Sequence, residues 1–147
     1  MKALLQVVSD SNVKVNNTVI GQIDKGLLVL LGVAKTDSQQ DVDYLFNKII
    51  NLRCFVDDSG KFQKDIRQVE GSILVISQFT LLAKTKKGRR PDFTEAADPI
   101  TAQALYLKFV QQLRDSGIPV QTGEFGANME VSLTNQGPIT LWLDSKA

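Results

Sequence analysis

The stretch Ser72-Ile73-Leu74-Val75-Ile76-Ser77-Gln78-Phe79-Thr80-Leu81-Leu82 combines strong apolar character with three polar side chains. Its first half is a β-branched run, which is typical of a strand covered on both faces. Ser77, Gln78 and Thr80 interrupt this run, and we expect the strand to continue through them. A buried polar group without a partner costs about 1–3 kcal/mol. The end of the strand is therefore a candidate site, and the alternative is that these side chains alternate outward to solvent.

The residues that the chain lacks narrow its chemistry. It has no histidine, which removes the usual base for a serine or cysteine nucleophile and the commonest transition-metal ligand. The single cysteine, Cys54, lies in an apolar context and is interpreted as a core residue. We expect no cofactor and identify no metal ligand, and structural zinc is excluded for want of ligands. An enzyme built from this chain must use carboxylates, lysines, backbone dipoles or groups of its substrate.

Length and composition predict one globular domain over residues 1–147. Charged residues at 22% and hydrophobic residues at 43% are ordinary for such a domain. No apolar run approaches the roughly 18 residues needed to cross a bilayer, and the first residues become polar too early for a signal peptide. We therefore expect a cytoplasmic protein without a membrane span.

The first half of the chain indicates strands at residues 3–8 and 27–33, the second of them central because it is continuously apolar. Asn16-Asn17 tolerates positive φ and is expected to close a hairpin. A helix is predicted over residues 38–51, with one apolar face formed by Val42, Leu45, Phe46 and Ile49. Its capping box is formed either by Thr36 with Gln39 or by Ser38 with Asp41.

The second half continues with a predicted strand at residues 52–56, a turn at 57–60 and an irregular segment at 61–70. Asp98-Pro99 is a typical helix start, and Gly117 with Pro119 supplies its stop. The apolar stripe of this helix consists of Tyr106, Phe109, Val110 and Leu113. Strands are expected at residues 120–122, 129–133 and 139–143. Gly137-Pro138 is interpreted as a hairpin turn between the last two, with a proline bond that is either cis or trans.

Residues 84–90 hold five cations in a chain whose formal net charge is +1. Such a local excess of positive charge creates a field that suits phosphate groups. The alternative is a solvated loop without a ligand.

The order of strands and two separated helices predicts an α+β or mixed α/β domain that is dominated by sheet. So many apolar strands with only two main helices leave part of the sheet uncovered. We expect a homodimer that packs sheets or strand edges together.

Four motifs in order resemble the D-aminoacyl-tRNA deacylase family, and the match spans essentially the whole chain. They are Ser77-Gln78-Phe79-Thr80, Lys87-Gly88-Arg89-Arg90-Pro91, the Phe125-Gly126-Ala127-x-Met129-x-Val131 segment and Asn135-x-Gly137-Pro138-Ile139-Thr140. The resemblance implies the fold of that family and a cytoplasmic homodimer. It also implies cleavage of the ester between a D-amino acid, or glycine, and the terminal adenosine of tRNA, with rejection of L-aminoacyl substrates.

The resemblance accounts for the missing histidine. It implies that a water attacks the ester with help from the 2′-hydroxyl of the tRNA, while the backbone N–H groups of Phe79 and Thr80 face the oxyanion. Ser77 and Gln78 would hold that turn and the ribose. Thr80 is interpreted as a positioning residue, with a nucleophile as the second interpretation, because no base in the chain is fit to activate it.

Three further roles follow from the resemblance alone. Gly137 and Pro138, joined by a cis bond, would enter the pocket of the partner subunit and exclude an L side chain. Phe125 and Met129 would line the adenosine pocket. The sequence departs from the family at Val7, where an arginine usually braces the Gly-Pro motif.

The basic segment supports a second hypothesis of another class. Its cations Lys86, Lys87, Arg89 and Arg90 are expected to contact tRNA phosphates. The same residues could serve a nucleic-acid-binding module without catalysis. Turnover distinguishes the two, because a binder protects aminoacyl-tRNA whereas an enzyme discharges it.

Overall fold

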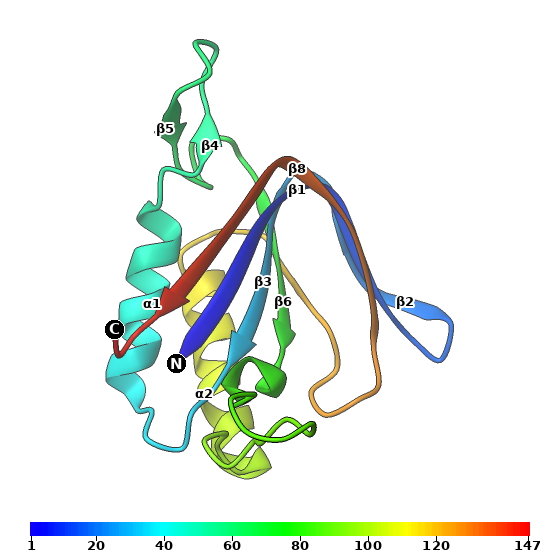
Figure 1. Ribbon diagram of the computed structural model, residues 1–147. Coiled ribbons are helices and arrows are strands. Elements are labelled where there is room, and N and C mark those ends of the chain that lie inside the picture. The colour runs from blue at the N-terminus through cyan, green and yellow to red at the C-terminus, as the bar shows by residue number, and fades with distance from the viewer.

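The computed structural model describes residues 1–147 and shows a sheet-dominated α+β domain, as the sequence predicted. The main sheet has the strand order β2-β1-β3-β6-β7, and β8 pairs with the other side of β1. Its strands are β1 (Lys2–Val15), β2 (Thr18–Ile23), β3 (Gly26–Gly32), β6 (Ser72–Ser77), β7 (Val120–Thr122) and β8 (Glu130–Asp144). The helices α1 (Gln39–Asn51) and α2 (Pro99–Asp115) lie on one side of this sheet (Figure 1). No helix is long and apolar enough to span a membrane.

Strand β6 is covered on both faces, as predicted. It lies between β3 and β7 and runs parallel to both. Ile73 and Val75 join the core beneath the helices, whereas Leu74 and Ile76 join a smaller core on the other face. Parallel strands packed in this way are near-continuously apolar, which is why the sequence pattern predicted a strand here.

The prediction that this strand continues past Ser77 is wrong. The N–H of Gln78 donates to the carbonyl of Leu31 (2.8 Å), and the 3₁₀ helix η1 (Phe79–Leu82) begins directly afterwards. The turn fits because β3 ends in a glycine. A Cβ on Gly32 would lie 2.6 Å from Cδ2 of Leu82 and 2.9 Å from the carbonyl oxygen of Gln78. The chain can fold back over β3 only at a residue without a side chain.

Both helices have the predicted caps. Ser38 forms the capping box of α1 with Asp41, so the second of the two alternatives is correct. Burial alone would raise the pKa of Asp41, but hydrogen bonds from the Ser145 hydroxyl, the Ser38 N–H and the Lys146 ammonium group lower it to about 2. Asp98 caps α2.

The small elements agree with the sequence only in part. Asn16 and Asn17 have φ of 50° and 64° and close the β1–β2 hairpin as predicted. The strand expected at residues 52–56 is confined to β4 (Phe55–Val56). It pairs with β5 (Phe62–Lys64), which lies inside the segment expected to be irregular. This two-stranded ribbon projects from the body of the molecule (Figure 1).

Gly137-Pro138 is not a hairpin turn, which corrects the sequence interpretation. Both halves of β8 pair antiparallel with β1, so the chain does not reverse. Asn135 pairs with Val8 and Thr140 with Gln6, so a step of five residues on β8 (140 − 135) faces a step of two on β1 (8 − 6). The motif therefore lies in a wide bulge, and the Gly137-Pro138 bond is cis.

On the sheet face away from the helices, the smaller core covers only part of the surface, and the part around Leu4 is left without a covering layer. Leu4 pairs with Leu30 on one side and with Trp142 on the other, so the three side chains form a row across the sheet. Leu4 and Leu30 are only half-buried, and Trp142 is 50% exposed. Apolar side chains gathered in this way are uncommon on the outside of an isolated domain.

Candidate active site

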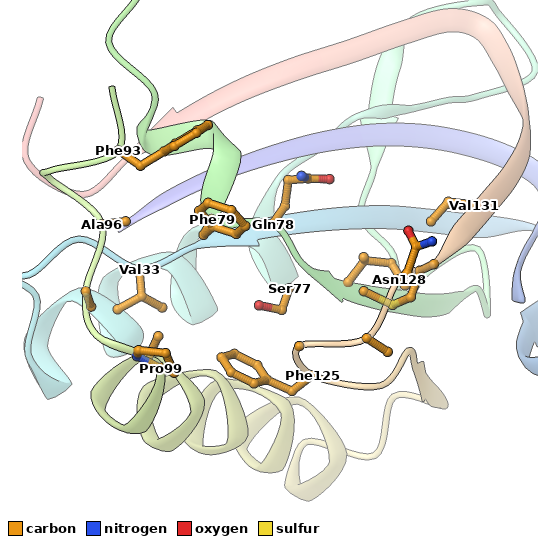
Figure 2. Close-up of a pocket in the computed structure, with 16 residues that line it drawn as sticks. Val33, Ser77, Gln78, Phe79, Phe93, Ala96, Pro99, Phe125, Asn128 and Val131 are labelled. Atoms are coloured by element: carbon orange, nitrogen blue, oxygen red, sulfur yellow. The ribbon is translucent and has the colours of Figure 1, made fainter. Parts of the chain in front are cut away.

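A cavity of about 600 Å³ opens at the end of β6, where the sequence placed the candidate site. Its walls come from the end of β6, from the loop that follows β7, and from the segment that leads into α2 (Figure 2). Eleven of its sixteen lining residues are hydrophobic, and none carries an ionisable side chain. The cavity can enclose an uncharged group but offers it no side-chain acid or base.

Three of the four residues expected at the strand end line this cavity, namely Ser77, Gln78 and Phe79. Figure 2 shows the Ser77 hydroxyl directed into the space between Phe79 and Phe125. Thr80 is exposed and lies outside the lining, and its hydroxyl accepts a hydrogen bond from the Gln78 amide. The Gln78–Thr80 contact pairs one of these polar side chains with another, while Thr80 also faces solvent.

The backbone of η1 supplies donors beside the cavity. The N–H of Leu81 already donates to the carbonyl of Gln78 (3.2 Å). The N–H groups of Phe79 and Thr80 lie before the first bond that a 3₁₀ helix can make, so they have no acceptor within η1. These two donors are the groups that the family resemblance assigned to the oxyanion.

The loop that follows β7 forms the opposite wall. The N–H of Gly123 donates to the carbonyl of Val75 (3.4 Å), after which the chain leaves the sheet. Phe125 and Met129 both line the cavity, so the structure brings them together with the end of β6. A Cβ on Gly123 would lie 2.5 Å from Sδ of Met129, so the thioether occupies space that only glycine leaves free.

Tyr106 supports this wall, a role that sequence reasoning missed because the residue belongs to the apolar stripe of α2. Its side chain is buried, and its hydroxyl donates to the carbonyl of Val75 (3.0 Å). Its ring contacts that of Phe125, with 5.8 Å between centroids. Burial raises the pKa of Tyr106 to about 12. Tyr106 thus fixes both the strand and the ring that border the cavity.

The third wall, formed by residues 93–102, was also missed, because its side chains carry no chemical signal. The N–H of Ala97 donates to the carbonyl of Val33 (2.9 Å), and the N–H of Lys35 donates to the carbonyl of Glu95 (3.0 Å). These bonds hold the segment against the end of β3. Its contributions to the lining are Phe93, Ala96, Ala97, Pro99 and Ala102.

The basic segment is a closed loop that connects two walls of the cavity. Backbone bonds in both directions between Lys84 and Asp92 (2.8 and 2.9 Å) close it. It follows η1 and leads directly to Phe93. Four of its five cations are exposed and form no ion pair, namely Lys86, Lys87, Arg89 and Arg90. Four free cations therefore lie on a short loop between two cavity walls.

Gly137 and Pro138 are exposed and do not line the cavity of their own chain. The Asn135 amide donates to the carbonyls of Val7 and Ile139 (2.9 Å each) and so closes the bulge. Val7 pairs with Leu27, and Leu27 pairs with Ile73. The bulge thus lies level with the start of β6, four residues or about 13 Å along the strand direction from Ser77.

No group of three or more His, Cys, Asp or Glu side chains is placed to hold a metal ion. Cys54 is buried, and burial raises the pKa of its thiol to about 11. The interpretation of Cys54 as a core residue is confirmed.

Comparison with known proteins gives consistent matches over the whole chain. A model of the family described as D-Tyr-tRNA(Tyr) deacylase matches residues 4–144. A D-aminoacyl-tRNA deacylase from Aquifex aeolicus is 51% identical over 146 residues, with 99% of each chain covered. One from Bacillus pumilus is 49% identical over 146 residues, again with 99% of each chain covered.

Two solved structures have the same fold. One, described as a c-Myc DNA unwinding element binding protein, has a TM-score of 0.94 at 40% identity with both chains fully covered. The other, a probable eukaryotic D-amino acid tRNA deacylase, has a TM-score of 0.79 with 97% of each chain covered. At 18% identity it supports the fold alone.

The fold and these matches define a member of the tRNA deacylases. The chain belongs to the D-Tyr-tRNA(Tyr) deacylase family, and its relatives carry the name D-aminoacyl-tRNA deacylase. The resemblance drawn from the four motifs is thereby confirmed.

The Tyr106 hydrogen bond generates a prediction about stability. Tyr106→Phe should lower the free energy of unfolding by about 1–2 kcal/mol, because a buried hydrogen bond is lost. The raised pKa keeps the hydroxyl neutral in the folded state, so the parent should lose stability as the pH rises from about 10 to about 12. Urea unfolding at pH 8, 10 and 11 measures both effects. The variant should lose less stability over this pH range than the parent, because it keeps only the contribution of the buried Cys54 thiol, whose pKa is also raised. An equal loss in both proteins would contradict the assignment.

Proposed function

We propose that this chain hydrolyses the ester bond of D-aminoacyl-tRNA and releases the free D-amino acid and tRNA. The observation that carries the proposal is a cavity with backbone donors at its edge and no ionisable side chain in its lining. Such a site cannot perform side-chain acid–base catalysis, but it suits an ester that is already activated. The enzyme acts in the cytoplasm, where aminoacyl-tRNAs are made and used.

In the proposed mechanism a water adds to the ester carbonyl, and the bond to the terminal ribose then breaks. The N–H groups of Phe79 and Thr80 stabilise the oxyanion, and a donor of this kind contributes about 3–4 kcal/mol. Ser77 and Gln78 hold the turn and the ribose, and the 2′-hydroxyl of the tRNA assists the water. Thr80 positions the ester rather than attacking it, since its hydroxyl already accepts from Gln78 and no base lines the cavity.

Backbone catalysis predicts a mild response to side-chain removal. Ser77→Ala and Thr80→Ala keep every backbone N–H, so each should reduce kcat by no more than about tenfold, far less than the loss of an oxyanion donor. Single-turnover assays with D-tyrosyl-tRNA and mass spectrometry of quenched samples would measure rate and any covalent adduct. Complete inactivity of Thr80→Ala, together with an acyl-enzyme in the parent, would establish the nucleophile interpretation instead.

The adenosine would occupy the part of the cavity formed by Phe125 and Met129. An aromatic ring and a polarisable thioether form a flat, adaptable surface that suits a purine. The remaining cavity would accept the amino acid.

Chirality is proposed to be enforced by exclusion, so glycyl-tRNA, including glycine mischarged on tRNA(Ala), should also be a substrate. A shape preference for one methylene discriminates by about 1–3 kcal/mol. Protection of the large L-aminoacyl-tRNA pool needs about three powers of ten, or about 4 kcal/mol.

We expect D-tyrosyl- and glycyl-tRNA to be discharged by catalytic amounts of protein and L-tyrosyl-tRNA to survive. Acid-gel analysis of charged tRNA over time makes the comparison. Discharge that stops at one substrate per chain, or protection of all three esters, would favour the non-catalytic nucleic-acid-binding hypothesis. That hypothesis draws support from the basic loop and from the likeness to a DNA-element-binding protein.

A homodimer would bring Gly137 and Pro138 to a cavity that they do not reach in their own chain. The uncovered row of Leu4, Leu30 and Trp142 provides an apolar face for a second copy. Glycine at position 137 lets backbone approach the substrate closely, because no side chain intervenes.

Light scattering should give about twice the chain mass of 16.2 kDa.

Mixed dimers of two variants test whether the site is shared between subunits. Ala97→Trp, which fills the cavity, and Gly137→Val, which blocks the motif, should each impair D-specific hydrolysis. Because the second variant keeps its cavity and the first keeps its motif, their mixed dimer should recover about half the parental activity. A monomeric enzyme, or no recovery in mixed dimers, would contradict the cross-subunit arrangement.

The basic loop is proposed to contact tRNA phosphates. Changing Lys86 and Arg89 together to alanine should flatten the logarithmic dependence of affinity on salt by about one to two units. Filter binding between 50 and 300 mM salt gives the slopes. A double change of Lys25 and Lys61 to alanine, two exposed lysines on other turns, is the matched control. Equal slopes in all three proteins would mean that the loop is only a solvated surface.

A further inference from the structure

An aromatic ring at the mouth of the cavity is exposed without a structural reason. Phe79 is 55% exposed, although its neighbour Leu82 in the same helix is buried. Burying a phenylalanine side chain normally contributes about 1.5–3 kcal/mol. The backbone role proposed for residue 79 needs only its N–H, so it does not explain this ring.

A second ring holds Phe79 in place. The rings of Phe79 and Phe93 meet edge to face, with centroids 5.0 Å apart and an angle of 63° between planes. Both rings line the cavity, and Figure 2 shows Phe93 on the segment beside η1. Two residues that are 14 positions apart (93 − 79) thus form one aromatic surface, made of the face of one ring and the edge of the other.

The backbone on both sides of this pair is fixed. Phe79 begins η1, whose Leu82 packs over Gly32. Phe93 follows the Lys84–Asp92 bridge, and its carbonyl accepts from the N–H of Ala96 (3.0 Å). The rings are therefore ordered before any ligand arrives, which lowers the entropic cost of binding to them.

The chemistry around the pair points to a nucleic acid. The basic loop follows η1, which begins at Phe79, and closes at Asp92, directly before Phe93, so its free cations and the two rings belong to one continuous segment. Aromatic faces beside a positively charged strip are the usual means of binding single-stranded nucleic acid without sequence preference. An apolar protein partner would not require the cations.

We propose that the Phe79–Phe93 pair is a stacking platform for the base of the nucleotide that precedes the terminal adenosine. The inference rests on the proposed deacylase function and adds a second nucleotide subsite to it. The terminal adenosine and the amino acid fill the cavity, and the chain of the substrate then leaves across the mouth. Its next base lies on the exposed ring, and its phosphates face the basic loop.

The test compares two small esters, D-tyrosyl-adenosine and D-tyrosyl-cytidylyl-adenosine, which differ by the preceding nucleotide. Stacking of one base on an aromatic side chain should give the parent about a 5- to 150-fold higher kcat/KM for the dinucleotide ester. Phe93→Leu and Phe79→Leu should bring this ratio towards one. Phe79→Tyr, which keeps an aromatic face, should preserve it.

Phe62→Leu is the matched control, since Phe62 is 58% exposed on β5 and does not line the cavity. It should leave the ratio unchanged. A ratio near one in the parent, or an unchanged ratio in both leucine variants, would overturn the platform while leaving the deacylase function intact. Failure of the parent to hydrolyse either ester, and tyrosyl-tRNA as well, would instead overturn the function and the platform with it.

A second copy of the chain is the rival occupant of the rings. Sedimentation of the same variants decides between them. The rings would belong to the subunit interface if Phe79→Leu or Phe93→Leu made the dimer dissociate more readily while the kcat/KM ratio of the two esters stayed unchanged. That result would overturn the inference.

Discussion

The hydrogen bond from the Gln78 N–H to the Leu31 carbonyl is the constraint on which the site depends. It is the last link between β6 and β3, and the next residue of β3 is a glycine. The missing Cβ lets the chain turn at once into η1, which turns the backbone N–H groups of Phe79 and Thr80 away from the ladder. A side chain at position 32 would push this turn outward and disturb the N–H groups proposed to bind the oxyanion and the aromatic rings together.

Local signals predicted the elements whose structure is decided locally. The caps at Ser38 and Asp98, the positive φ at Asn16-Asn17 and the apolar run of β6 each depend on neighbouring residues. The strand end at Ser77 could not be predicted, because it depends on a glycine in another strand. Gly137-Pro138 has the composition of a turn, but whether the chain reverses there depends on pairing with β1.

The candidate site shows the same division. Ser77 and Gln78 were found because polar groups in an apolar run are unusual, and Phe79, Phe125 and Met129 because family motifs contain them. The wall of residues 93–102 was not found, since alanines and a proline carry no chemical signal. Tyr106 was assigned to the core, which is correct, yet its contacts with Val75 and Phe125 also make it part of the frame of the site.

The bulge in β8 also bears on how the protein avoids aggregation. β8 pairs with β1 along one edge only, so its outer edge is a long row of free backbone groups. Edges of this kind recruit strands from other molecules unless they are interrupted. The bulge divides the edge into two shorter pieces, and Pro138 removes one donor at the break. A motif that the family resemblance assigns to substrate selection therefore also limits strand-to-strand growth.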